Sequence, residues 1–290
     1  MKTKLTSLAL AFGLGASLTS LSATAQTNSV DQTSSTTAQP PPAESSGETD
    51  QDLVKKLSNP VASLISAPLQ NNFDFRGGPT GKGFTYKLNI QPVIPFSLND
   101  HWNLISRTIV PFIHQENITA DGATQTGLGD TTASFFFAPS QPGAGGMVWG
   151  VGPAFLLPTA TRTVLGTQKW CIGPTGLILW QNSGWTYGAL VTQLWSFAGD
   201  SSRADVNQTS LQPFLAYATQ TKTTFTINSE STYDWEGRQW TVPLNAMVSQ
   251  LVRVGKLPMS FQVGARYYAD KPANGPDWGL RFTMTFVFPK

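Results

Sequence analysis

The sequence has little charge, one cysteine and two histidines. Charged residues make up 12% of the 290 residues, about half the share that soluble domains carry. The single cysteine, Cys171, excludes an intramolecular disulfide and a cysteine-based metal cluster. An enzyme with a histidine base would have to use His101 or His114.

The chain also lacks a basic excess once its first residues are set aside. Lys2 and Lys4, an apolar run over residues 5–21 and Ala23-Thr24-Ala25 form the pattern of a secretory signal, which we expect to be cut after Ala25. A retained transmembrane anchor is the alternative. Removing residues 1–25 lowers Lys+Arg from 19 to 17, equal to the 17 Asp+Glu. The neutral mature chain gives no indication of nucleic-acid binding.

Long apolar runs are missing from the rest of the chain. The longest, GMVWGVGPAFLLP, is interrupted by Gly and Pro and is too short to cross a membrane as a helix. If this exported protein lies in a membrane, strands must span it.

Residues 26–51 are rich in Ser, Thr, Gln and Pro, which predicts a disordered linker. Residues 52–68 follow as a short helical segment, with Asp50 or Asp52 as its cap and a second turn starting at Pro60. This segment could lie at the interface below a barrel, or reach into the barrel as a plug.

The stretch 223–252, TTFTINSESTYDWEGRQWTVPLNAMVSQLV, indicates the architecture. Apolar and aromatic residues alternate with polar ones on both sides of the turn Glu236-Gly237-Arg238, which is the period of a β-strand. Each arm is longer than a typical globular strand. Long arms, aromatic ends and a polar second face are typical of a lipid-facing barrel.

The same pattern continues over residues 69–290 and predicts an all-β, transmembrane antiparallel β-barrel of about twelve strands. We expect strands near 69–76, 84–98, 102–116, 129–140, 146–160, 169–182, 185–199, 209–220, 223–237, 238–255, 257–271 and 278–288. Prolines inside them predict bulges or local breaks. Short and long connections alternate, which places both termini on the periplasmic side. The short turn 236–238 is the exception on the outer side.

Several motifs resemble a family of bacterial outer-membrane barrels regarded as transporters. They include NPVASLISAPLQNNFDF, NIQPVIPFSLNDHWNLISRTIVPFI, GLGDTTASFFFAP and STYDWEGRQWTVPLNAMVSQLV. The family is similar to barrels associated with the meta-pathway of phenol degradation and is sometimes mislabelled neuromedin U. The resemblance covers roughly residues 52–290. It implies a barrel in the outer membrane and a transport role, and it supplies no catalytic residues.

The polar faces of the strands supply the candidate lumen residues. They are Asp74, Lys87, Asn89, Gln91, Arg107, Asp130, Asn228, Glu230, Asp234, Asn245, Arg266 and Arg281. Opposite charges should pair in a narrow barrel, because an isolated buried charge costs several kcal/mol. We expect Glu230 and Asp234 to meet Arg107, Arg266 or Arg281. The network could select solutes, or it could fill a barrel too narrow to conduct, since twelve strands lie between filled and water-filled barrels.

The predicted function is a channel or transporter in the bacterial outer membrane for a small solute, hydrophobic solutes included. A non-conducting structural or adhesive barrel that acts through its loops is the alternative, and an outer-membrane lipid hydrolase is a distant third. For a hydrolase, neither histidine has a nucleophile and a third group nearby in the sequence. We expect no enzyme activity, metal, cofactor or nucleic-acid partner. The expected partners are outer-membrane lipids, the barrel-assembly machinery during biogenesis and the unknown solute.

Overall fold

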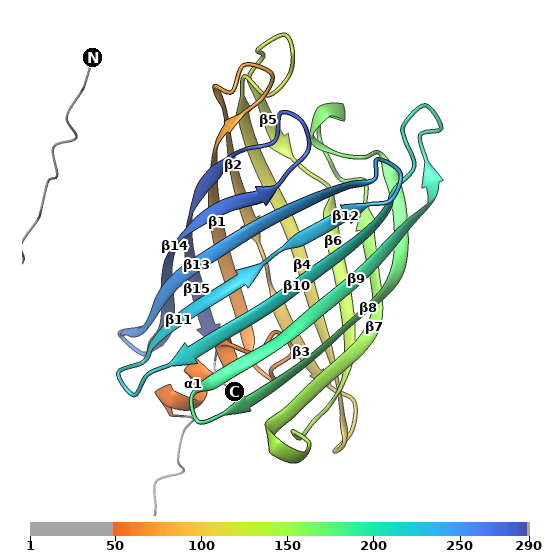
Figure 1. Ribbon diagram of the computed structural model, residues 1–290. Coiled ribbons are helices and arrows are strands. Elements are labelled where there is room, and N and C mark those ends of the chain that lie inside the picture. The colour runs from red at the N-terminus through yellow and green to blue at the C-terminus, as the bar shows by residue number, and fades with distance from the viewer. Residues whose placement is uncertain (1–48, 289–290) are drawn as a thin grey trace, which may run out of the picture. The chain divides into compact units, whose positions relative to one another are not determined.

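A computed structural model describes residues 49–288 of the protein. The predicted signal peptide, most of the predicted linker and residues 289–290 lie outside the described residues. The described chain forms one closed antiparallel barrel preceded by a short helix (Figure 1). Its fifteen strand segments make twelve spans, because three spans are each interrupted once. The sheet closes where the first span pairs with the last. The prediction of an all-β barrel of about twelve strands is confirmed.

The elements follow each other as an up-and-down meander. In chain order they are α1 (Asp50–Leu57), β1 (Ile65–Gly77), β2 (Gly83–Ile90), β3 (Val93–Ser97), β4 (Trp102–Glu116), β5 (Gln125–Leu128), β6 (Thr131–Pro139), η1 (Ala144–Gly146), β7 (Met147–Leu157), η2 (Thr163–Leu165), β8 (Lys169–Asn182), β9 (Trp185–Gly199), β10 (Asn207–Ala218), β11 (Thr223–Ser229), β12 (Ser231–Asp234), β13 (Gln239–Val254), β14 (Leu257–Asp270) and β15 (Trp278–Phe288). The interrupted spans are β2/β3, β5/β6 and β11/β12.

Some of the prolines expected to disturb the wall do so. β2 ends before Gln91-Pro92, and β3 resumes at Val93; Pro92 has no N–H to donate to a ladder. The register between β13 and β14 shifts at Val242/Pro243. Pro213, in contrast, pairs with Ala189 in an unbroken register. The expectation of a bulge or break at every strand proline is therefore wrong.

The two ends of the barrel differ in the length of their connections. Tight turns join the strands at the end where α1 lies, and longer loops project from the other end (Figure 1). In the turn between β8 and β9, Ser183 and Gly184 both have positive φ, as a two-residue type I′ hairpin requires. The 235–238 turn is the short connection at the long-loop end, as the sequence pattern predicts.

The outer face of the barrel is apolar. Phe225, Ile227 and Leu244 alternate with interior residues on β11 and β13 and remain 55%, 59% and 47% exposed. Aromatic pairs lie near strand ends, among them Trp102–Trp149 and Tyr233–Trp240. An exposed apolar band bordered by aromatic residues is the surface that a lipid bilayer covers.

Across residues 49–288, no helix is both long enough and apolar enough to cross a membrane.

Candidate functional site in the barrel interior

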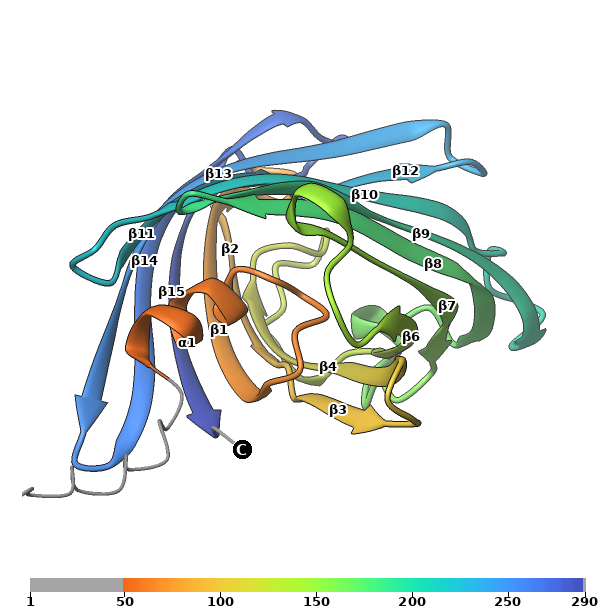
Figure 2. The same cartoon turned by 90° about the horizontal axis from the view of Figure 1, so that it is seen from below.

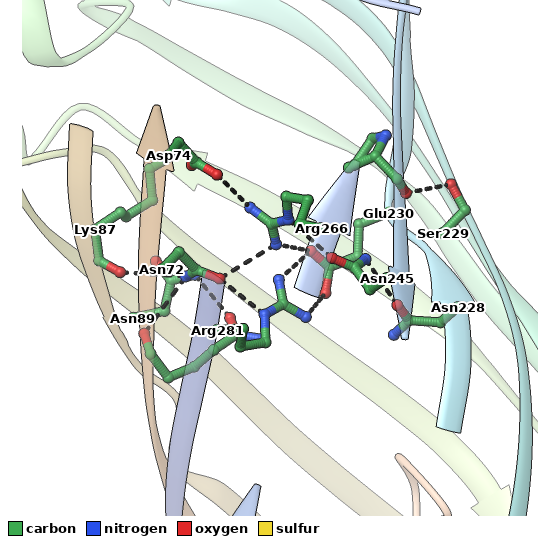
Figure 3. Close-up of polar contacts among 12 residues, drawn as sticks. Asn72, Asp74, Lys87, Asn89, Asn228, Ser229, Glu230, Asn245, Arg266 and Arg281 are labelled. Carbon is green, nitrogen blue, oxygen red and sulfur yellow. Dashed lines mark hydrogen bonds and ion pairs between the residues drawn. The ribbon is translucent and has the colours of Figure 1, made fainter. Parts of the chain in front are cut away.

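A charged cluster lies inside the barrel, with Glu230 at its centre. Glu230 occupies the interruption between β11 and β12. Arg281 of β15 donates from Nη1 to Oε1 and from Nη2 to Oε2 of Glu230, both at 2.7 Å. Arg266 of β14 donates from Nη2 to Glu230 Oε2 at 3.1 Å (Figure 3). The fork of Arg281 matches the carboxylate bidentately, and the contact crosses from one part of the wall to another rather than joining neighbouring strands.

Amide side chains and a second carboxylate complete the charged cluster. Asn72 Oδ1 accepts from Arg281 Nε at 2.8 Å and from Arg266 Nη2 at 3.2 Å. Asn245 Oδ1 accepts from Arg266 Nε at 2.8 Å, and Asp74 lies 3.4 Å from Arg266 Nη1. These side chains are buried. The two guanidinium groups are thus both paired and hydrogen-bonded, which offsets much of the cost of burying them.

A chain of amides connects the charged cluster to β4. The amide of Gln70 lies within hydrogen-bond distance of Asn89, Gln91 and Arg281. Gln91 Oε1 in turn accepts from Arg107 Nη2 at 3.1 Å. On the other side, Asn245 Nδ2 donates to Asn228 Oδ1 at 2.8 Å.

The structure brings together the candidate lumen residues except Asp130, Asp234 and the Lys87 side chain. Asp130 accepts from the backbone of Ala160 and Thr167, so it fixes the loop 158–168. Asp234 is exposed and accepts from the Glu236 amide in the hairpin tip. The expectation that Glu230 meets Arg266 or Arg281 agrees with these contacts. The expectation that Asp234 meets an arginine does not, because its side chain closes the local turn.

Lys87 shares its strand face with Asn89, which places its side chain on the interior side of β2. Its backbone carbonyl accepts from Asn72 Nδ2 at 3.2 Å. Within residues 49–288, its ammonium group makes no ion pair.

Sequence reasoning missed Asn72 and Gln70. Both lie on the same face of β1 as Asp74, at two-residue intervals. The alternation that selected Asp74 could therefore have selected them as well.

Helix α1 and the residues that connect it to β1 occupy the tight-turn end of the barrel (Figure 2). Leu53, Val54, Ala62 and Leu64 pack against Leu251 and Val287 on one part of the wall. Val61 packs against the opposite part, in a cluster with Ile105, Phe136, Ala138, Leu177, Leu179 and Leu190. Contacts with opposite walls mean that this segment, residues 50–64, lies within the barrel mouth rather than beside it. We call it the inner segment.

Polar contacts hold the inner segment to the turns around it. Asp50 forms ion pairs with Lys222 and Arg253, both at 2.6 Å. The hydrogen bonds from Lys222 and then Arg253 hold the pKa of the Asp50 carboxyl below its ordinary value. The helix is capped by Thr49, with Asp52 as the reciprocal partner of a capping box. The expected cap at Asp50 or Asp52 is therefore one or three residues too late.

Two cavities occupy the remaining interior. The outer cavity, of about 670 Å³, reaches the loop residues Gly166, Thr167 and 202–206. The inner cavity, of about 290 Å³, lies between the charged cluster and the inner segment. Arg107, Leu190 and Gln212 line both cavities, so the two spaces meet at these side chains. Their linings together include loop residues 202–206 at one end and residues of the inner segment at the other.

No family model and no curated protein matches the sequence. Among solved structures, an outer membrane channel from Pseudomonas putida F1 is similar, with a TM-score of 0.62 and 15% identity, over 78% of this chain and 96% of that one. The chain has an outer-membrane β-barrel fold. Two other barrels are similar at lower TM-scores. They are the outer membrane phospholipase A of Escherichia coli (0.45, 9% identity, 84% of this chain and 98% of that one) and the beta domain of a Bordetella autotransporter (0.41, 14% identity, 78% and 99%).

The two histidines of this outer-membrane barrel lie outside the charged cluster. His101 is exposed in the tight turn between β3 and β4. His114 lies near the long-loop end of β4, where Nδ1 is 2.7 Å from Thr126 Oγ1 and Nε2 is 3.1 Å from Glu116 Oε1. His114 therefore contacts a hydroxyl, from Thr126 of β5, through one ring nitrogen and a carboxylate, from Glu116, through the other. The sequence did not reveal this partner, because Thr126 reaches His114 only through strand pairing.

No group of three or more metal-ligating side chains occurs in the part of the chain that the structure describes. The polar contacts of the charged cluster inside the barrel are made by charged and amide side chains.

Proposed function

We propose that the protein is an outer-membrane channel that conducts a small solute through the barrel interior and is closed at its inner end by the inner segment. The observation that carries this proposal is the pair of cavities meeting at Arg107. They run from the long loops to residues 50–64. The similar fold of an outer membrane channel is consistent with it.

The lengths of the connections between strands indicate how the barrel is oriented in the outer membrane. In bacterial barrels, short turns face the periplasm and long loops face the outside. The inner segment then lies on the periplasmic side, where the predicted signal and linker would leave the N-terminus. The exposed apolar band would contact outer-membrane lipids. We propose as well that the protein is related to the transporters of the phenol-degradation type. We also propose that it needs the barrel-assembly machinery to insert into the membrane.

A non-conducting structural or adhesive barrel is the competing function. It would share the same wall, but its interior network would serve only to fill the barrel. The two functions differ in what happens when the inner segment is loosened. A channel should open, whereas a filled barrel should stay closed or unfold.

Conductance in planar lipid bilayers tests the proposal. Val61→Asp introduces a charge where Val61 contacts the apolar wall, so it should release the inner segment and raise the open fraction at least several-fold over the wild type. Ser63→Asp, in the same segment but only half-buried, is the matched control and should change the current little. If folded wild-type and Val61→Asp proteins both fail to pass current, the transport function is wrong.

A lipid hydrolase is the third candidate function, and the hydrogen-bonded residues Thr126, His114 and Glu116 allow it to be tested. The order of their contacts is unusual, because the hydroxyl meets Nδ1 and the carboxylate meets Nε2. We expect that purified wild-type protein and His114→Ala will hydrolyse phospholipid micelles equally slowly. Activity that disappears in His114→Ala and in Thr126→Val would contradict this expectation.

A further inference from the structure

Arg107 is the interior arginine with the fewest partners in the polar network. Arg266 and Arg281 each make several hydrogen bonds and share Glu230. Arg107 donates one side-chain hydrogen bond within the described chain, to Gln91, and makes no ion pair there. Its guanidinium carries five N–H donors, so most of them have no hydrogen-bond partner in the described chain, and the side chain lines both cavities.

The charge balance around Arg107 is positive. The charged cluster and its surroundings hold four cationic side chains, Lys87, Arg107, Arg266 and Arg281, but two carboxylates, Asp74 and Glu230. Both carboxylates are engaged with Arg266 or Arg281. Two further carboxylates, Asp205 and Asp234, line the outer cavity; Asp205 pairs with Lys169, and Arg203 lines the same cavity. Arg107 has no carboxylate partner in the described chain, so an anion beside it would be attracted and little screened.

Part of the wall of the outer cavity is apolar. Ile109 follows Arg107 by two residues on the same face of β4, and it lines the outer cavity together with Leu156 and Val206. All three are only half-buried, so they keep apolar surface free towards the cavity. A cavity of about 670 Å³ lies within the size range of small-molecule sites.

We propose that this junction binds an amphipathic monoanion, with its carboxylate on Arg107 and its apolar body against Ile109, Leu156 and Val206. A planar guanidinium pairs with a carboxylate bidentately, and Arg107 has the free donors to do so. The apolar wall selects against small hydrophilic anions, which would leave that surface uncovered. This inference rests on the proposed channel function and names its solute class.

Calorimetric titration of the purified protein in detergent micelles tests the site without requiring conduction. The probes are 2-naphthoate and its neutral counterpart 2-naphthamide, with titrations into protein-free micelles subtracted. We expect the wild type to bind naphthoate at least about tenfold more tightly than naphthamide, because only naphthoate forms charge-assisted hydrogen bonds.

Arg107→Gln should remove the preference for naphthoate and leave naphthamide binding nearly unchanged. Arg76→Gln is the matched control, because Arg76 is a solvent-exposed arginine at the barrel rim, and it should behave as the wild type. Circular dichroism and heat-dependent gel mobility establish that each variant is folded. Equal binding of the two probes to the wild type, or an unchanged preference in Arg107→Gln, would overturn the site.

The two proposals fail separately. Binding with the predicted preference in a protein that never conducts would leave the site standing and reject the channel. Conduction without any preference for naphthoate would reject the site and leave the channel.

Discussion

The interior of the barrel has two halves that are held together by different forces. Along β1, β2 and β13–β15, charged and amide side chains pair with one another around Glu230. Along β4, β6, β8 and β9, a group of inward apolar side chains packs around Val61 of the inner segment. The first half gains its stability from satisfied charges, and the second from burial of apolar surface.

The two halves show how a closed sheet can enclose cavities and still be stable. The charged cluster fixes side chains inside the barrel and leaves the inner cavity beside it, while the outer cavity adjoins at Arg107. The apolar half instead provides a surface on which a segment or a solute can rest without forming specific hydrogen bonds. Each half can be weakened independently, and the following predictions are ordered by the size of the expected effect.

The apolar half should be the more sensitive to truncation. Phe136 is 1% exposed inside the barrel, whereas its neighbour Phe137 is 44% exposed on the outer face. Phe136→Ala should lower the free energy of unfolding by about 3–5 kcal/mol, because a cavity replaces the ring. Phe137→Ala should cost less, since lipid can fill the space. Urea titration in lipid vesicles measures both, and equal losses would mean that the two faces are assigned wrongly.

The charged half depends on Glu230. Glu230→Gln leaves Arg266 and Arg281 without their shared carboxylate, and we expect a loss of about 3 kcal/mol in the free energy of unfolding. This loss is at the low end of the range for breaking a buried ion pair, because the Glu230 side chain is 29% exposed. Glu236→Gln, at the exposed hairpin tip, is the control. A Glu230 variant as stable as this control would show that the charged cluster does not stabilise the barrel.

The membrane-facing surface can be probed on β13. Leu244→Lys places a charge on the outer face and should destabilise the barrel by about 2–4 kcal/mol if the position lies at mid-bilayer. The next residue, Asn245, faces inward and is 1% exposed. Asn245→Asp should cost less, because the carboxylate still accepts from Arg266 Nε. Equal costs, measured by the same titration, would argue against this alternation of faces.

The contact between the inner segment and the wall should depend on pH. Its Asp50 has a lowered pKa in the folded protein, so the ion pairs stabilise the segment fully above the unfolded value. That stabilisation is lost as the pH falls below about 4 and through the lowered folded pKa. The protection of the amides of residues 50–57, the intrinsic exchange rate at each pH divided by the observed rate, should therefore be several-fold higher at pH 6 than at pH 3. Asp50→Asn should show low protection at both pH values; protection as high as in the wild type at pH 6 would show that Asp50 does not anchor the segment.

Alternation along the strands predicts the fold well because every span has one lipid-facing and one interior face. Even the spans β7 and β8, which are rich in Gly and Pro, lie close to their predicted boundaries. β1 begins at Ile65, four residues before the predicted start, since Ile65–Pro68 pairs with β15 across the closure of the barrel. A pairing between the two ends of the chain leaves no local signal.

The interior site could be predicted only in part. The period of two identifies which side chains point inward, but it does not place them along the barrel axis. Asp234 is therefore indistinguishable in sequence from Glu230, although it lies in the hairpin tip. The location of the inner segment depends on contacts of Val61 with strands far along the chain, and helix signals at residues 50–57 cannot specify those contacts.

The central claim, that solute moves through the interior, can be tested with a cysteine pair on β11. Thr226 lines the inner cavity, whereas Ile227, the next residue, faces outward and is 59% exposed. Thr226→Cys or Ile227→Cys would be combined with Val61→Asp and treated with a charged methanethiosulfonate during bilayer recording; the native Cys171 is buried. Modification should reduce the current clearly in the Thr226→Cys protein and leave it unchanged in the Ile227→Cys protein. A current that responds in neither protein, or equally in both, would contradict passage through the barrel.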